Sequence, residues 1–154
     1  MNRKEIADLI VRRIGEEKNC LKNHYKDSND KIGYFFVDEL LPDELAKNIF
    51  DSFPKPETMK LRKSLREYKY IAAQMDQCNA LLEEAIYAFQ DRRVVELIKD
   101  ITEIEHLYPD EHLYAGGISL IGKGQFLNPH LDNSHEKDRK QWRVLNLLYY
   151  VSPG

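Results

Sequence analysis

The chain has 154 residues, 26 acidic and 23 basic side chains, and a formal net charge of −3. A chain of this length predicts one fold unit, and its apolar content of 42% is enough to fill a core, which excludes wholesale disorder. No basic block stands out, which argues against a nucleic-acid partner. The longest apolar run, 144–151, is far shorter than the roughly 20 residues that span a bilayer, so no membrane partner is expected.

Cysteine usage and the N-terminus indicate the compartment. Two cysteines, Cys20 and Cys78, are too few for a disulfide scaffold or a thiolate metal cluster. The first residues lack the apolar stretch of a secretory signal. We therefore expect a cytoplasmic protein in which the two cysteines need not be paired.

The N-terminal segment has the apolar spacing of a helix. Between residues 3 and 26 the apolar positions return mostly to one helical face, and Asn2 followed by Glu5 is the signature of a capping box. These positions are Ile6, Leu9, Ile10, Ile14 and Leu21. After a break at Gly33, the aromatic and β-branched segment 34–37 predicts a strand.

A second helix is predicted near Pro42, because proline is tolerated in a first turn and the acidic residues after it suit the helix dipole. The helix is expected to end at 54–56. The side chains expected to be buried are Leu45, Ile49, Phe50 and Phe53. Beyond it, 68–72 is a candidate strand, and Asp76 is interpreted as the cap of a third helix. The third and fourth helices are expected to carry the apolar positions of 81–89 and 94–101.

After Pro109 the pattern changes from helical spacing to short apolar runs separated by glycines, which is typical of strands. The predicted strand regions are 113–121, 126–132 and 143–152. Helices gathered before strands favour an α+β fold over a repeated βαβ unit. The charged cluster 137–140 is interpreted as the solvated tip of a hairpin between the last two regions.

His130 and Asp132 are the residues that could carry chemistry. Residues two apart on a strand point to the same face, so both side chains can reach one ion. An imidazole and a carboxylate supply two corners of the facial triad that holds non-haem Fe(II) with open positions. The His-x-Asp pattern is weak when it stands alone, because it arises easily by chance.

The surrounding sequence strengthens this interpretation. A Gly-rich turn at 122–124 leads into the His-x-Asp segment, and after a loop comes Arg143-Val-Leu-Asn-Leu-Leu-Tyr-Tyr-Val-Ser. The combination resembles the iron(II)- and 2-oxoglutarate-dependent oxygenases of the prolyl-hydroxylase type. The resemblance covers roughly residues 32–154, and its specificity lies in 116–152. It implies N-terminal helices packed on a partial double-stranded β-helix, or jelly-roll, sheet, with residues 1–31 as a helical extension of the oxygenase-like domain at 32–154.

The resemblance also implies roles for individual residues. His130 and Asp132 match the first two iron ligands, and Tyr150 matches the tyrosine that hydrogen-bonds the distal carboxylate of 2-oxoglutarate. Asn146 lies at a polar position of the same pocket. The implied activity is that of a dioxygenase, with Fe(II) and 2-oxoglutarate, that hydroxylates an unactivated C–H bond of a small molecule or of a protein side chain. A carboxylate at Asp132 favours hydroxylation over halogenation.

The sequence departs from the family pattern in two ways. Leu120 stands where these enzymes often have another pocket tyrosine. The third iron ligand and the basic residue that binds 2-oxoglutarate lie beyond Gly154 on the family plan, so we expect the natural protein to be longer. An apolar strand at 144–151 without further neighbours would expose an edge, which predicts a homodimer through that edge.

Two other functions stay open from the sequence. One is a non-catalytic jelly-roll binding or interaction domain without a complete metal site. The other is a cupin-type metal enzyme without 2-oxoglutarate, in which His135 joins His130 and Asp132 around zinc or iron. Metal stoichiometry combined with 2-oxoglutarate binding distinguishes the three functions.

Overall fold

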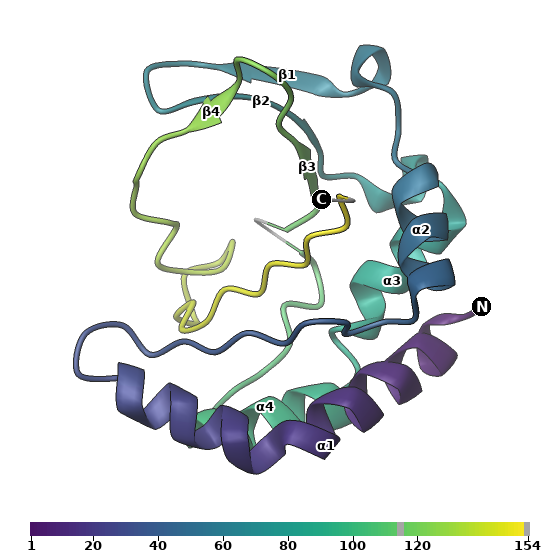
Figure 1. Ribbon diagram of the computed structural model, residues 1–154. Coiled ribbons are helices and arrows are strands. Elements are labelled where there is room, and N and C mark those ends of the chain that lie inside the picture. Colours follow the sequence, from purple (N-terminus) through teal and green to yellow (C-terminus); the bar gives the residue numbers. More distant parts are fainter. Residues whose placement is uncertain (114–115, 153–154) are drawn as a thin grey trace. The chain divides into compact units, whose positions relative to one another are not determined.

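A computed structural model describes residues 1–113 and 116–152, which form helices and an antiparallel sheet (Figure 1). The predicted α+β class is confirmed. The chain divides into two compact units. The first contains 1–51, 84–109 and the chain from Val151, and the second contains 52–83 and 110–150.

The longest helix of the first unit is α1, Arg3–Ser28. The predicted capping box is present, because the Asn2 side chain accepts from the Glu5 N–H at 3.0 Å and the Glu5 carboxylate accepts from the Asn2 N–H at 2.9 Å. The apolar face is buried as its spacing predicts, with Ile6 and Ile10 both fully buried. The start of this helix and its core-facing side are therefore determined by local sequence.

Helix α4, Arg92–Thr102, packs against α1. Asp91 caps it by accepting from the Arg93 N–H at 2.9 Å, and Val94 and Ile101 are each 1% exposed. Two ion pairs flank the apolar contact, Lys18 with Asp100 and Lys22 with Glu103, each at 2.7 Å. The predicted helix around 94–101 is confirmed.

Helix α2, Asp43–Asp51, begins one residue after Pro42, whose carbonyl accepts from the Ala46 N–H at 2.9 Å. Leu45 and Ile49 are buried as predicted. The predicted burial of the two phenylalanines is wrong, because Phe50 is 38% exposed and Phe53 lies past the end of the helix, half-buried.

The strand predicted at 34–37 is also wrong, because among the described residues no neighbouring strand pairs with this segment. Its aromatic side chains instead contact the last turns of α1. The His24 ring lies edge-on to Tyr34 and Phe36, with centroids 4.9 Å and 5.3 Å away, and Tyr25 meets Phe35 in the same manner. Residues that look suited to a strand here pack as an aromatic cluster.

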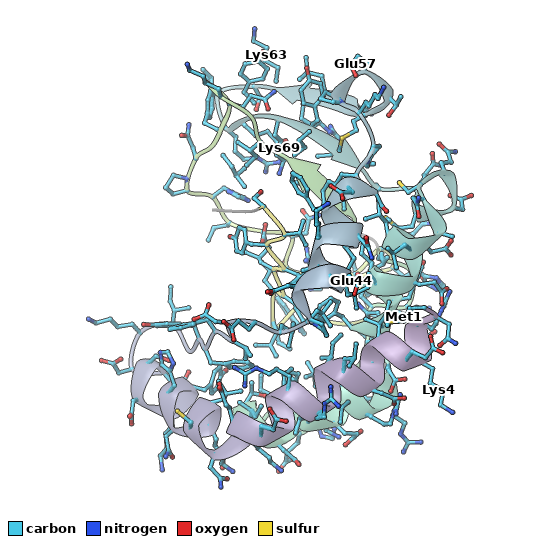
Figure 2. The ribbon with its side chains drawn as sticks, turned by 45° about the vertical axis from the view of Figure 1, so that its right-hand side comes forward. Met1, Lys4, Glu44, Glu57, Lys63 and Lys69 are labelled. Carbon is cyan, nitrogen blue, oxygen red and sulfur yellow. The ribbon has the colours of Figure 1, made fainter. Side chains whose placement is uncertain are left out.

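The second unit is built on a small antiparallel sheet (Figure 1). Its strands are β1 Lys60–Lys63, β2 Glu67–Ala72, β3 Ile118–Leu120 and β4 Phe126–Leu127. Strand β2 is central: β1 pairs with it on one side, and β3 and β4 pair with different parts of it. The candidate strand at 68–72 is confirmed. Lys63 is paired with Tyr68, so the two side chains lie on the same face of the sheet. The next residue, Lys69, points to the opposite face (Figure 2).

The β structure after Pro109 is less extensive than predicted. Of 113–121, only Ile118–Leu120 is a strand, and residues 114–115 lie outside the described residues. Of 126–132, only Phe126–Leu127 pairs, and 143–152 forms no strand within the described chain. For the other described residues of these three regions the strand prediction is wrong. An apolar run forms a strand only where a neighbouring strand supplies the backbone hydrogen bonds.

Helix α3, Ala80–Ala88, follows the short 3₁₀ helix η2, Met75–Gln77; a second short 3₁₀ helix, η1, spans Pro56–Thr58. The predicted cap is wrong, because Asp76 lies inside η2. Asn79 supplies the cap, its side-chain oxygen accepting from the Leu81 N–H at 2.9 Å.

Neither compact unit has a boundary between residues 31 and 32, where the sequence places the end of the N-terminal extension. Residues 1–51 instead belong to one unit with 84–109, because α1 packs against α4. The assignment of 1–31 and 32–154 as extension and domain stays a prediction. Cys20 and Cys78 are both free thiols. Across the described residues, no helix has both the length and the apolar content needed to cross a membrane.

Candidate metal centre

Asn128 fixes the start of the candidate site on the sheet of the second unit. Its N–H donates to the Arg66 carbonyl and its side-chain amide donates to the Leu65 carbonyl, both at 2.8 Å. The segment that follows β4 is thereby tied to the turn between β1 and β2. Two residues further on, His130 Nδ1 lies 2.8 Å from the Asn128 carbonyl oxygen.

This contact sets the tautomer of His130. A carbonyl oxygen can only accept, so Nδ1 must carry the hydrogen and Nε2 is the nitrogen left to face a ligand. Nε2 lies 3.2 Å from Oδ1 of Asp132. The structure therefore brings the two predicted ligands together, although both lie beyond the end of β4 and not on a strand.

Asp132 is held from its other side. Its Oδ2 accepts from the side-chain amide of Asn146, and the Asn146 oxygen accepts from the Arg143 guanidinium at 3.0 Å. The hydrogen bond from Asn146 is the main cause that lowers the pKa of Asp132, and the positive charges of His130 and Arg143 act in the same direction against partial burial. The side chain is therefore an anionic donor at neutral pH.

The geometry of the pair suits a metal ion. His130 Nε2 faces a carboxylate oxygen, an arrangement that is stabilised either by a proton on Nε2 or by a metal cation between the two atoms. Two ligands with metal bonds of about 2.1 Å at a right angle lie about 3 Å apart, close to the observed 3.2 Å. The side chains are 24% and 47% exposed, so an ion bound here stays open to further ligands.

His135 does not join this pair. Its ring lies over Trp142, with centroids 4.0 Å apart, and its Nδ1 lies 2.8 Å from the Ser134 hydroxyl. Within 1–113 and 116–152 no group of three His, Cys, Asp or Glu side chains gathers in a metal-binding arrangement. This geometry therefore does not support the alternative in which His135 shares one ion with His130 and Asp132.

The residues expected around a cosubstrate are spread over the segment after Arg143. Tyr150 is 83% exposed, and Leu148 is 72% exposed. Asn146 turns toward Asp132, with one of its two amide hydrogens engaged there. The cosubstrate roles of Asn146 and Tyr150 stay predictions.

The sequence alone missed the supporting roles of Asn128, Arg143 and Asn146. One signal was present for Asn146: a regular hairpin with its tip at 137–140 places Asp132 opposite Leu145, so that Asn146 lies within one residue of the position facing Asp132. The Asn128 contact uses a backbone carbonyl, which no residue type signals.

A comparison of the chain with protein-family models, with curated proteins and with solved structures finds no match. The basis for a functional proposal is therefore the geometry of the site and the resemblance of its sequence motifs to those of the oxygenases named above.

Proposed function

We propose that the chain belongs to an Fe(II)- and 2-oxoglutarate-dependent dioxygenase that hydroxylates an unactivated C–H bond of a small molecule or of a protein side chain. The observation that carries the proposal is the placement of His130 Nε2 3.2 Å from Asp132 Oδ1, with Nδ1 bound to a backbone carbonyl. Ligating histidines characteristically donate their second ring N–H in this way. In this proposal, residues 116–152 are the metal-binding part of a jelly-roll sheet.

The residues of the chain would hold the metal and keep its ligands in orientation. His130 Nε2 and Asp132 are the donors, and Fe(II) with 2-oxoglutarate and O₂ would supply the oxidising chemistry. The Asn128 carbonyl fixes the imidazole ring, while Asn146, itself held by Arg143, fixes the carboxylate.

The proposed cosubstrate contacts come from Asn146 and Tyr150. The second amide hydrogen of Asn146 has no partner among the described residues and can donate to 2-oxoglutarate without breaking the bond to Asp132. The exposed hydroxyl of Tyr150 is accessible to the distal carboxylate of the cosubstrate. Both roles follow from the sequence resemblance.

Anaerobic titration with Fe(II), or with Mn(II) as an inert substitute, tests the metal site. We expect 1:1 binding, weaker than that of a complete facial triad, because only two protein ligands are proposed. His130→Ala and Asp132→Ala should each abolish it, whereas the matched control His135→Ala should leave it unchanged. Metal-dependent conversion of 2-oxoglutarate to succinate is the second readout. Tight binding that is lost in the control variant would show that the ligand set is wrong.

A non-catalytic jelly-roll binding domain is the second candidate. The observation that favours it is the row of exposed apolar side chains after Arg143, which suits contact with another chain. Val144, Leu147, Leu148 and Tyr150 are 52%, 53%, 72% and 83% exposed. Absence of metal binding in the titration would favour this candidate, and metal binding without any affinity for 2-oxoglutarate would favour a cupin-type metal enzyme. The sequence predicts a homodimer through a strand edge; because 143–152 forms no strand within the described chain, the proposed homodimer uses these exposed side chains instead.

A further inference from the structure

A hairpin extends directly from the candidate metal pair. The Arg143 N–H donates to the Ser134 carbonyl at 2.9 Å, and the Glu136 N–H donates to the Gln141 carbonyl at 3.2 Å. His135 and Trp142 form an antiparallel bridge between these bonds. At the base, the side chains of Asp132 and Asn146 join the same two arms. The segment 134–143 is thus an arm whose base is the metal pair, and we call it the site hairpin.

The tip of the site hairpin, 137–140, carries three basic side chains and one acidic side chain and is therefore net positive. Glu136 does not offset this charge through an ion pair, because its carboxylate accepts from the backbone N–H groups of Asp138 and of Lys140, the latter at 2.6 Å. Lys137, Arg139 and Lys140 are all exposed, and none of them forms an ion pair within the described part of the chain. Asp138 is the one acidic side chain interspersed among them.

The backbone of the tip is fixed in a strained form. Arg139 has φ of 57°, in the left-handed region that few residues other than glycine adopt readily. Such strain persists only where surrounding contacts impose it, and the bonds to Glu136 are those contacts. The three cations are therefore presented from a defined loop.

An aromatic surface lies beside these cations. Trp142 is 71% exposed, and the His135 ring covers one of its faces at 4.0 Å between centroids. The rest of the indole is largely exposed to solvent. Tryptophan and arginine are both enriched among the residues that carry binding energy at protein interfaces, so this composition suits a recognition surface.

We propose that the site hairpin binds an acidic polypeptide segment of the substrate, with Lys137, Arg139 and Lys140 pairing with its carboxylates and Trp142 packing on its side chains. The inference rests on the proposed function and names the substrate class: a protein or peptide with acidic residues near the hydroxylated residue.

A polypeptide fits this surface better than a nucleic acid. The tip holds only three cations with a carboxylate among them, which is a small and interrupted charge cluster compared with the extended basic surface that neutralises a continuous polyphosphate. A short acidic segment needs only a matching number of charges. The covered face of Trp142 also removes one of the two stacking surfaces that bases use.

The hairpin geometry predicts where the acidic residues lie. An extended chain rises about 3.3 Å per residue, so Trp142 lies about 13 Å along the arm from Asn146 and Gln141, where the arm meets the turn, about 17 Å. A substrate running extended along the arm therefore carries its acidic residues about five to six positions from the hydroxylated residue.

Fluorescence anisotropy with a fluorescein-labelled octaglutamate peptide tests the proposal on the full chain. The test variant combines Lys137→Gln, Arg139→Gly and Lys140→Gln, in which glycine suits the left-handed position and keeps the hairpin folded. The control variant combines Lys55→Gln, Lys60→Gln and Arg62→Gln, which removes the same charge from exposed positions of the same unit.

We expect the test variant to raise Kd at least tenfold and to reduce its salt dependence, and the control to change Kd less than twofold. Equal weakening in both variants, or wild-type binding no tighter than to a Gly-Ser peptide, would overturn the proposal. Tighter binding of an oligothymidylate that is lost in the test variant would overturn it in favour of nucleic acid.

Parallel Mn(II) titration separates this inference from the proposed function. Mn(II) binding without octaglutamate binding means that the hairpin inference alone is wrong. Octaglutamate binding that the test variant loses, in a protein that binds no Mn(II), means that the hairpin binds acidic segments and the oxygenase assignment is wrong.

Discussion

Asn146 donates a hydrogen bond to the carboxylate of Asp132, a residue 14 positions earlier in the chain. Arg143 holds the oxygen of the same amide at 3.0 Å, so the amide is oriented from both ends. The carboxylate therefore has one oxygen fixed by Asn146 and one directed at His130. This arrangement makes Asn146 a positioning residue for the candidate metal site.

Replacing Asn146 by alanine should weaken metal binding without removing a ligand. Loss of an outer-shell partner typically costs about 10- to 100-fold in metal affinity. Mn(II) titration followed by electron paramagnetic resonance measures the change. Asn133→Ala is the control, because Asn133 is exposed and forms no hydrogen bond with either ligand in the described part of the chain. An unchanged affinity in Asn146→Ala would contradict the positioning role.

The pKa of Asp132 gives a metal-free test of the same contact. The hydrogen bond from Asn146 lowers that pKa below the ordinary value. The carboxylate therefore contributes stability that is fully present above the unfolded-state pKa of about 3.9 and is lost as the pH falls through the lower folded-state pKa. Carboxyl carbon chemical shifts followed by NMR over the acid range should show this low pKa, and Asn146→Ala should raise it. A titration at the ordinary value in both proteins would mean that the bond is absent in solution.

The packing of α1 against α4 should dominate the stability of the first unit. Ile10 is fully buried on α1, so Ile10→Ala should lower the free energy of unfolding by about 2–5 kcal/mol. Arg12→Ala, an exposed position on the same helix, should change it by less than about 0.5 kcal/mol. Urea denaturation followed by circular dichroism compares the two. Equal, small effects would show that α1 does not bury this face.

The sequence predicts the helices better than the strands, for a physical reason. The face of α1 and its capping box depend on residues within a few turns, and local spacing carries that information. A strand depends on a neighbour that can be far away in the chain. Thus 34–37 and the residues from 144 to 152 have strand-like composition but no pairing partner in the described structure.

The same division holds within the candidate site. His130 and Asp132 converge as predicted, but the strand on which the spacing argument depends is absent, because both residues lie beyond the end of β4. The contact of Asn146 depends on the register of the site hairpin, and the orientation of His130 depends on a backbone carbonyl held by the turn between β1 and β2. Predicting these partners requires knowing the pairing between segments, which residue types alone do not specify.

The exposed apolar side chains after Arg143 should drive self-association of the 154-residue chain. Leu148 is 72% exposed, and burying such side chains against a second copy removes apolar surface from water. Sedimentation velocity should show a concentration-dependent dimer that Leu148→Lys shifts toward monomer. Leu65→Lys is the matched control, because Leu65 is 96% exposed on the turn between β1 and β2 of the same unit. A wild-type chain that stays monomeric at every concentration, or an equal shift in both variants, would exclude this segment as the contact.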